Sequence, residues 1–261
     1  MVFPRQLARR IFGVVAADDG GADAVTAVGV ATRVGAELRL LALQPEDESP
    51  SGLEAERLRQ TLSSVNPAHP PQIRFAHGRL AVDAAHLANN PQTDMLLVGR
   101  HAAEGDPRLL SDLLFRARVP VLVAGVGWAG EGPVLAALDG EERGAAVALL
   151  AEEFASRLQL ALCIVTVDAS GDAMPDGLLP PRAARTRRLL ARVAASSSAY
   201  PALLRVQVQS RVGDVGPEVA AAAEALRASV LVMGRRTGSA SGAHAASVMS
   251  RWHGATLLLP I

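Results

Sequence analysis

The chain has 261 residues with 26 basic and 26 acidic side chains, so its formal net charge is zero. All the basic side chains are arginine; hydrophobic residues make up 49 % of the chain and aromatic residues only 3 %. This balance argues against a general nucleic-acid-binding protein, whose affinity comes from excess cations and base stacking. The aliphatic content excludes a mainly disordered chain, and the length suits one large or two small domains.

The first predicted strand is Ile11–Ala17. An export signal is the alternative for this segment, but the apolar run is short and meets Asp18 and Asp19 directly. No stretch approaches the roughly 18 apolar residues that cross a bilayer. The single cysteine, Cys163, cannot form an internal disulfide. We therefore expect a soluble, cytoplasmic protein that binds neither membranes nor nucleic acid.

The first half alternates aliphatic runs with segments of helical periodicity, which indicates a parallel sheet covered by helices. Its expected strands are Ile11–Ala17, Glu37–Leu43, Gln72–Ala76, Met95–Val98 and Val119–Ala124. Its expected helices are Ala22–Val34, Gly52–Val65, Leu80–Ala88 and a short helix near Leu109–Arg116. The glycine-rich segment Gly125–Gly132 is interpreted as a linker.

The second half repeats this order. Its expected strands are Val134–Leu138, Leu160–Val167, Leu203–Val208, Val230–Met233 and Thr256–Leu259. Its expected helices are Val147–Leu158, Arg182–Ala195, a helix opened by Gly216 and Pro217, and Ala243–Trp252. Proline in the first turn costs no helical hydrogen bond, which favours the third of these helices.

Matching segments indicate that the two halves are copies of one unit. Met95–Arg100 (MLLVGR) and Val230–Arg235 (VLVMGR) are 135 positions apart, as are Gly78 and Gly213. We predict an α/β protein with two tandem open parallel five-stranded sheets, each with helices on both faces. The domains are expected at residues 1–125 and 133–261.

Ligands of open parallel sheets bind beyond the carboxyl ends of the strands, where the strand order reverses. Three segments of the second half end strands there: Asp139-Gly140, Val212–Asp214, and Leu231–Gly234 before a Gly/Ser-rich loop. In these segments the chain resembles the universal stress proteins, with the second half matching well and the first half more faintly. The resemblance implies a tandem, two-domain member with the adenine nucleotide alpha hydrolase-like fold.

The resemblance also implies where an ATP molecule would lie in the second half. Asp139 and the backbone of Val167 would face the adenine, Gly213 would approach the ribose, and Gly234 with its loop would wrap the phosphates. The implied cofactor-binding residues are Asp139, Val167, Gly213, Gly234, Arg235, Thr237, Gly238, Ser239 and Ser247.

The loop departs from the Gly-x2-Gly-x9-Gly-Ser/Thr pattern of the ATP-binding members. Thr237 stands where the second glycine is expected, with glycine displaced to Gly238, and the closing pair is Ala246-Ser247 or Gly242-Ala243. In the first half, Gly99 is followed only by Gly105. We therefore expect the first half to have lost the nucleotide motif, so that ATP is a candidate cofactor for the second half alone.

Three sets of charged or polar residues allow both a functional and a structural interpretation. Arg100 and Arg235 either capture an anion or are solvated loop arginines. His77, His86 and His101 lack metal-ligand spacing, so a structural role is expected and no metal site. The arginines between Arg182 and Arg192 either bind an acidic partner or nucleic acid, or form a solvated helix face, which the neutral net charge favours.

The function expected from the sequence is a non-enzymatic stress-response role through binding a small molecule or a protein partner. One alternative is a nucleotide-hydrolysing or nucleotide-transferring enzyme, but the chain has no lysine for a Walker motif and no Gly-x-Ser-x-Gly elbow. Another is a scaffold that uses neither pocket. Pairing of the two domains through Val119–Ala124 and Thr256–Leu259 is expected, and a homodimer remains open.

Overall fold

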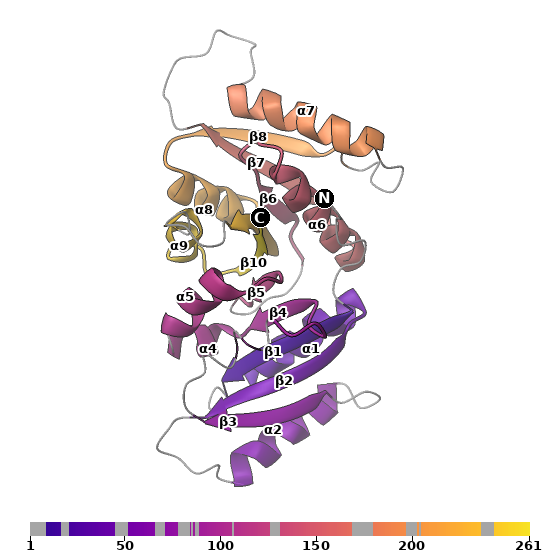
Figure 1. The fold of residues 1–261 in the computed structure, drawn as a ribbon, viewed down its shortest axis with the longest axis vertical. Helices are drawn as coiled ribbons and strands as arrows, with labels where there is room; N and C mark the ends of the chain where they lie inside the picture. The colour runs from indigo at the N-terminus through magenta and orange to yellow at the C-terminus, as the bar shows by residue number, and fades with distance from the viewer. Residues whose placement is uncertain are drawn as a thin grey trace. The chain divides into compact units, whose positions relative to one another are not determined.

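The computed structural model describes residues 9–16, 21–44, 52–65, 71–77, 84, 86, 89–105, 107–125, 131–168, 180–196, 203, 205–235 and 243–261. The chain forms two compact units (Figure 1). The first unit consists in the main of Arg5–Trp128 and the second of Ala129–Leu259 with Ile261.

The first unit contains a parallel sheet with the strand order β3-β2-β1-β4-β5. The strands are β1 (Arg10–Ala16), β2 (Glu37–Gln44), β3 (Gln72–His77), β4 (Met95–Val98) and β5 (Val121–Val123). Its helices are α1 (Ala22–Val34), α2 (Gly52–Val65), α4 (Arg100–Gly105) and α5 (Pro107–Arg116).

The second unit has the equivalent order, β8-β7-β6-β9-β10, and β6 pairs in parallel with both β7 and β9. The strands are β6 (Val134–Ala137), β7 (Leu162–Asp168), β8 (Gln207–Val212), β9 (Val230–Arg235) and β10 (Ala255–Pro260). Its helices are α6 (Gly144–Leu158), α7 (Pro181–Ser196), α8 (Val215–Ala225) and α9 (Ala243–Met249). The α/β class predicted from the sequence is thus confirmed.

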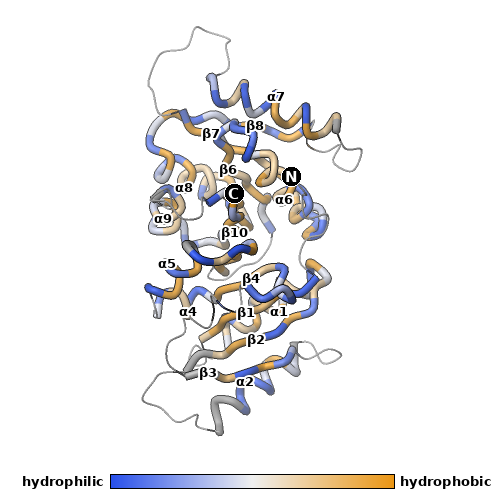
Figure 2. The backbone as a smooth tube through the Cα atoms, in the orientation of Figure 1, coloured by the Kyte–Doolittle hydropathy of each residue, from blue (hydrophilic) through white to orange (hydrophobic). Residues whose placement is uncertain are grey.

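The aliphatic runs form the centre of each sheet because central strands are covered on both faces. All four residues of β4 are buried, as are the first three of β6. Helices contribute one apolar side each. Figure 2 shows this for α7, where hydrophobic and hydrophilic stretches alternate along the helix, and Leu189 and Leu190 of this helix are buried.

Four elements differ from the expected ones or lie outside the described residues. The strand expected at Leu203–Val208 is wrong, because β8 begins at Gln207; as an edge strand it is polar and half-exposed, and buried Leu203 precedes it. Helix α4 was not expected, because six residues are too few for an apolar period. Strand β5 is shorter than expected and begins just after Pro120, which cannot donate a ladder hydrogen bond. The helix expected at Leu80–Ala88 lies largely outside the described residues.

Candidate functional site

The strand order reverses between β1 and β4 in the first unit and between β6 and β9 in the second. In open parallel sheets the carboxyl ends of the strands at such a reversal form the usual ligand site. The residues that follow β6, β7, β8 and β9 are therefore the ones that decide what the second unit can bind.

Beyond β6, the chain turns sharply at Asp139-Gly140. The Asp139 carboxylate accepts a hydrogen bond from the backbone N–H of Glu141 at 2.9 Å, and its side chain is otherwise exposed. Gly140 has φ +78°, and a Cβ there would lie 3.1 Å from the Arg182 carbonyl oxygen and 3.2 Å from Thr186 Oγ1. Glycine is required here because the turn is left-handed and lies directly against α7.

Beyond β7, the first turn of α7 covers Val167 and Asp168. The Arg182 guanidinium donates to the carbonyl oxygen of Val167, and the Arg182 backbone N–H donates to Asp168 Oδ1 at 3.3 Å. The carbonyl that the resemblance assigns to an adenine therefore already accepts a hydrogen bond from this chain.

One buried polar atom of β7 and one of α7 have no hydrogen-bond partner among the described residues. They are Asp168 Oδ2 and Thr186 Oγ1. Asp168 is 8 % exposed and Thr186 is 0 % exposed. Thr186 lies one helical turn after Arg182, so both face the strand ends from the same side of α7. Because buried polar groups are normally paired, these atoms mark a place where a partner is missing.

Beyond β8, Gly213 has φ +141° and its N–H donates to the Asp168 carbonyl oxygen at 3.0 Å. A Cβ at Gly213 would lie 3.1 Å from Cγ of Glu218, whose carboxylate is 3.3 Å from the Arg211 guanidinium. The strand end at Gly213, to which the resemblance assigns the ribose, is thus lined by the ion pair of Arg211 and Glu218.

Beyond β9, Gly234 and Arg235 still belong to the strand. The Ile261 side chain packs against Gly234, and its Cδ1 would be 2.5 Å from a Cβ added at Gly234. The Ile261 N–H donates to the Arg235 carbonyl oxygen at 2.9 Å. Arg235 is 2 % exposed, and burial lowers the pKa of its guanidinium to about 10. The loop residues Thr237, Gly238 and Ser239 lie outside the described residues.

Ser247 lies in the interior of α9 and not at its amino terminus. Its hydroxyl would lie 2.1 Å from a Cβ added at Gly216, so the absent side chain of Gly216 lets α8 and α9 pack closely. The Ser247 hydroxyl also accepts a hydrogen bond from Arg251 at 3.1 Å. Ser247 therefore takes part in the packing of α9 against α8, and its assignment to a phosphate loop stays a prediction.

In the first unit, a carboxylate from the chain itself occupies the space beside the glycine that follows β4. Asp23, in the first turn of α1, is 4 % exposed. It accepts hydrogen bonds from the backbone N–H groups of His101 and Ala102 at 3.4 and 3.2 Å, and His101 Nδ1 lies 3.2 Å away. A Cβ at Gly99 would lie only 2.0 Å from Asp23 Oδ2.

The two arginines after the fourth strands are not solvated, so that interpretation is wrong. Arg100 is 8 % exposed and its Nε donates to Glu104 at 2.6 Å, while Arg235 is buried in β9. Of the three histidines named from the sequence, His101 contacts Asp23. Within the described ranges, no group of three or more histidine, cysteine or acidic side chains is placed to hold a metal ion.

Sequence reasoning placed Asp168 at the end of a strand without giving it a role, and it missed Asp23 and Thr186. Asp23 and Thr186 each interrupt an apolar helix face, which is a detectable signal. Neither the contact of Asp23 with Gly99 nor the missing partner of Thr186 follows from that pattern alone.

Residues 132–251 match the model of the Universal stress protein family. Over these residues the second unit is similar to that family, which confirms the resemblance noted in the sequence. No curated protein sequence matches the chain. None of the described helices combines the length and the apolar character that a bilayer span needs.

Solved structures with the same fold span both units. A universal stress protein from Archaeoglobus fulgidus has a TM-score of 0.67 at 16 % identity, covering 98 % of this chain and 97 % of its own. A Pseudomonas aeruginosa protein described as a universal stress protein has a TM-score of 0.66 at 19 % identity, covering 97 % and 93 %. The cytoplasmic domain of a prokaryotic cation chloride cotransporter reaches 0.57 at 12 % identity, covering 97 % and 95 %. Identities this low establish the fold alone.

Proposed function

We propose that the chain is a non-catalytic, stress-response binding protein whose second unit holds an adenine nucleotide, with ATP as the first candidate, and whose first unit holds none. The observation that carries this proposal is two buried atoms without a hydrogen-bond partner among the described residues: Asp168 Oδ2 at the carboxyl end of β7, and Thr186 Oγ1 of α7 beside the Gly140 turn that follows β6. The family match over residues 132–251 supports a ligand of the kind that the resemblance implies.

The chemistry of this place suits a flat base with an amino group. A carboxylate oxygen and a carbonyl oxygen are acceptors, and the amino group of adenine is a donor that either of them can receive. To bond with the Val167 carbonyl, the base has to displace the Arg182 guanidinium. Asp168 Oδ1 would keep its hydrogen bond from the Arg182 backbone, so the first turn of α7 stays in place.

The difference between the units supports the proposal that the first unit holds no nucleotide. Aligning Asp18 with Asp139 places Asp23 opposite Gly144, the first residue of α6. The first unit thus has a buried carboxylate where the second has no side chain at all. Like charges repel strongly in a place of low dielectric, so a phosphate is disfavoured beside Asp23.

Replacing Thr186 by valine is expected to stabilise the free protein and weaken nucleotide binding. The isosteric change removes a buried hydroxyl that has no hydrogen-bond partner in the described part of the chain, which is worth about 1 kcal/mol in unfolding free energy. Equilibrium urea unfolding and calorimetric titration with MgATP measure the two effects. Thr166→Val is the matched control: Thr166 is also fully buried, but its hydroxyl donates to the Gln209 carbonyl oxygen at 3.5 Å, so no stabilisation is expected. A Thr186→Val variant that binds MgATP unchanged would contradict the assignment.

Replacing Arg182 by alanine is expected to tighten nucleotide binding by about three- to tenfold, because the base then displaces no guanidinium from Val167. The control is Arg185→Ala on the next turn of α7, whose exposed side chain has no partner among the described residues. Calorimetric titration of both variants with MgATP measures the difference. Weaker binding by Arg182→Ala would mean that this guanidinium holds the ligand and does not compete with it.

A further inference from the structure

A polar groove of about 220 Å³ lies at the amino-terminal ends of β1, β2 and β3 in the first unit. This is the end of the sheet opposite to the strand ends described above, so the groove is independent of the proposed nucleotide site. Its polar lining includes Arg10, Glu37, Arg39, Gln72, Arg74 and Gln92.

Strand register places the arginines on one face of the sheet. Phe12 pairs with Arg39, Arg39 pairs with Gln72, and Leu41 pairs with Arg74. Paired positions of parallel strands share a face, and alternate residues return to it. The other face is covered by helices: a Cβ at Gly13 would lie 3.7 Å from Cβ of Ala27 in α1.

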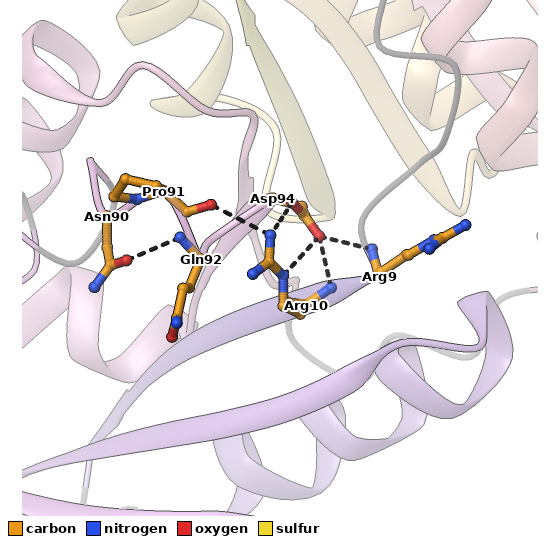
Figure 3. A network of polar contacts seen from close by, with 6 residues as sticks. All are labelled: Arg9, Arg10, Asn90, Pro91, Gln92 and Asp94. Atoms are coloured by element: carbon orange, nitrogen blue, oxygen red, sulfur yellow. Dashed lines mark hydrogen bonds and ion pairs between the residues drawn. The ribbon is translucent and has the colours of Figure 1, made fainter.

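The turn at residues 90–94 is held by hydrogen bonds and forms one wall of the groove (Figure 3). Asp94 Oδ2 accepts hydrogen bonds from the backbone N–H groups of Arg9 and Arg10 at 3.1 and 2.9 Å, and Arg10 Nη2 donates to the Pro91 carbonyl oxygen at 3.2 Å. The Gln92 N–H donates to Asn90 Oδ1 at 2.8 Å. These bonds hold the turn in shape before any ligand arrives.

The charges of the groove do not cancel. Arg10 is paired with Asp94 at 3.1 Å, and Arg39 with Glu37 at 3.1 Å. Burial works to raise the pKa of Asp94, but the hydrogen bonds and charge of Arg10 and the N–H of Arg9 outweigh it and lower that pKa, so the first pair stays ionised. Among the described residues Arg74 has no ion-pair or hydrogen-bond partner, which leaves one uncompensated cation.

Arg39 can contribute to the same ligand. Its contact with Glu37 uses Nε and Nη2, so Nη1 is available in the described structure. A guanidinium presents its N–H groups in a planar fork that suits carboxylate and phosphate oxygens. The side-chain amides of Gln72 and Gln92 add neutral donors around the two arginines.

We propose that this groove binds a small organic anion, with its carboxylate or phosphate group between Arg39 and Arg74. Pockets for drug-sized ligands measure about 300–1,000 Å³, so this groove takes a smaller molecule. Arg74 supplies the charge that attracts the anion, and Arg39 supplies directional donors. Glu37 competes with the ligand for Arg39.

Titrations of the full chain with inorganic phosphate and, separately, with succinate test this site, at constant ionic strength and with arginine side-chain NMR signals as the readout. Saturable shifts of Arg39 and Arg74 are expected, and the ion that binds more tightly identifies the preferred head group. Arg74→Gln is expected to weaken binding about tenfold. The matched control is Arg57→Gln, an exposed arginine of α2 on the covered face of the sheet, which should bind as the unmodified chain does.

Glu37→Gln makes the test independent of any loss of folding. It removes the competing carboxylate, so binding should become several-fold tighter, an outcome that a damaged protein cannot produce. Absence of saturable shifts with either ion would overturn the proposal. So would equal affinities of Arg74→Gln and Arg57→Gln, or weaker binding by Glu37→Gln.

Discussion

Replacing Asp23 by alanine is expected to lower the unfolding free energy of the first unit by about 3 kcal/mol. Asp23 is 4 % exposed and accepts hydrogen bonds from two backbone N–H groups at the start of α4. Alanine would leave the buried Ala102 N–H and the partly buried His101 N–H without this partner, and a buried unsatisfied donor costs about 1–3 kcal/mol. It would also leave His101 Nδ1 without its contact at 3.2 Å.

Hydrogen exchange measured by mass spectrometry resolves this effect, because peptides from β4 report on the first unit alone. In Asp23→Ala these peptides should exchange about 100-fold faster under conditions where exchange follows the opening equilibrium. Asp112→Ala is the control, since Asp112 in α5 is half-exposed and has no partner among the described residues. If the two variants exchange at the same rate, the hydrogen bonds of Asp23 to the start of α4 do not stabilise the first unit.

Gly99→Ala is expected to destabilise the first unit by about 2–3 kcal/mol, because its Cβ would lie 2.0 Å from Asp23 Oδ2. The cost should nearly disappear when Asp23 is glycine, since the obstructing carboxylate is then gone. A double-mutant cycle of the two substitutions, followed by the same exchange experiment, measures the coupling.

Gly234, the equivalent glycine of the second unit, serves as the comparison for the double-mutant cycle of Gly99 and Asp23. At Gly234 the nearest obstruction is Ile261 Cδ1 at 2.5 Å, the end of a flexible side chain. Gly234→Ala should therefore cost about 1 kcal/mol or less. Additive effects of Gly99→Ala and Asp23→Gly would show that the contact between them contributes nothing to stability.

The sequence alone predicts most of the fold, because the strands at the sheet centres are continuous aliphatic runs. Met95–Val98 coincides with β4, and Ala22–Val34 coincides with α1. Strand β8 was displaced in the prediction because an edge strand carries polar residues such as Gln207 and Gln209, which give no apolar signal.

The candidate site was only partly predictable, since it depends on contacts between residues that are far apart in sequence. The pattern correctly places Asp139, Val167 and Gly213 at strand ends. It could not show that Arg182, a residue of the basic helix α7, bonds with the Val167 carbonyl oxygen. The predicted helix at Ala243–Trp252 has the start that α9 shows, but the sequence could not reveal that α9 packs against α8 at Gly216.

The central claim is that the two units differ at the carboxyl ends of their strands, with a nucleotide site in the second unit and an internal carboxylate closing the equivalent place in the first. Calorimetric titration of the full chain with MgATP tests this most directly through the number of molecules bound per chain. One molecule per chain is predicted, with an affinity that Thr186→Val lowers. Two molecules per chain, no binding, or binding that Thr186→Val leaves unchanged would contradict the claim.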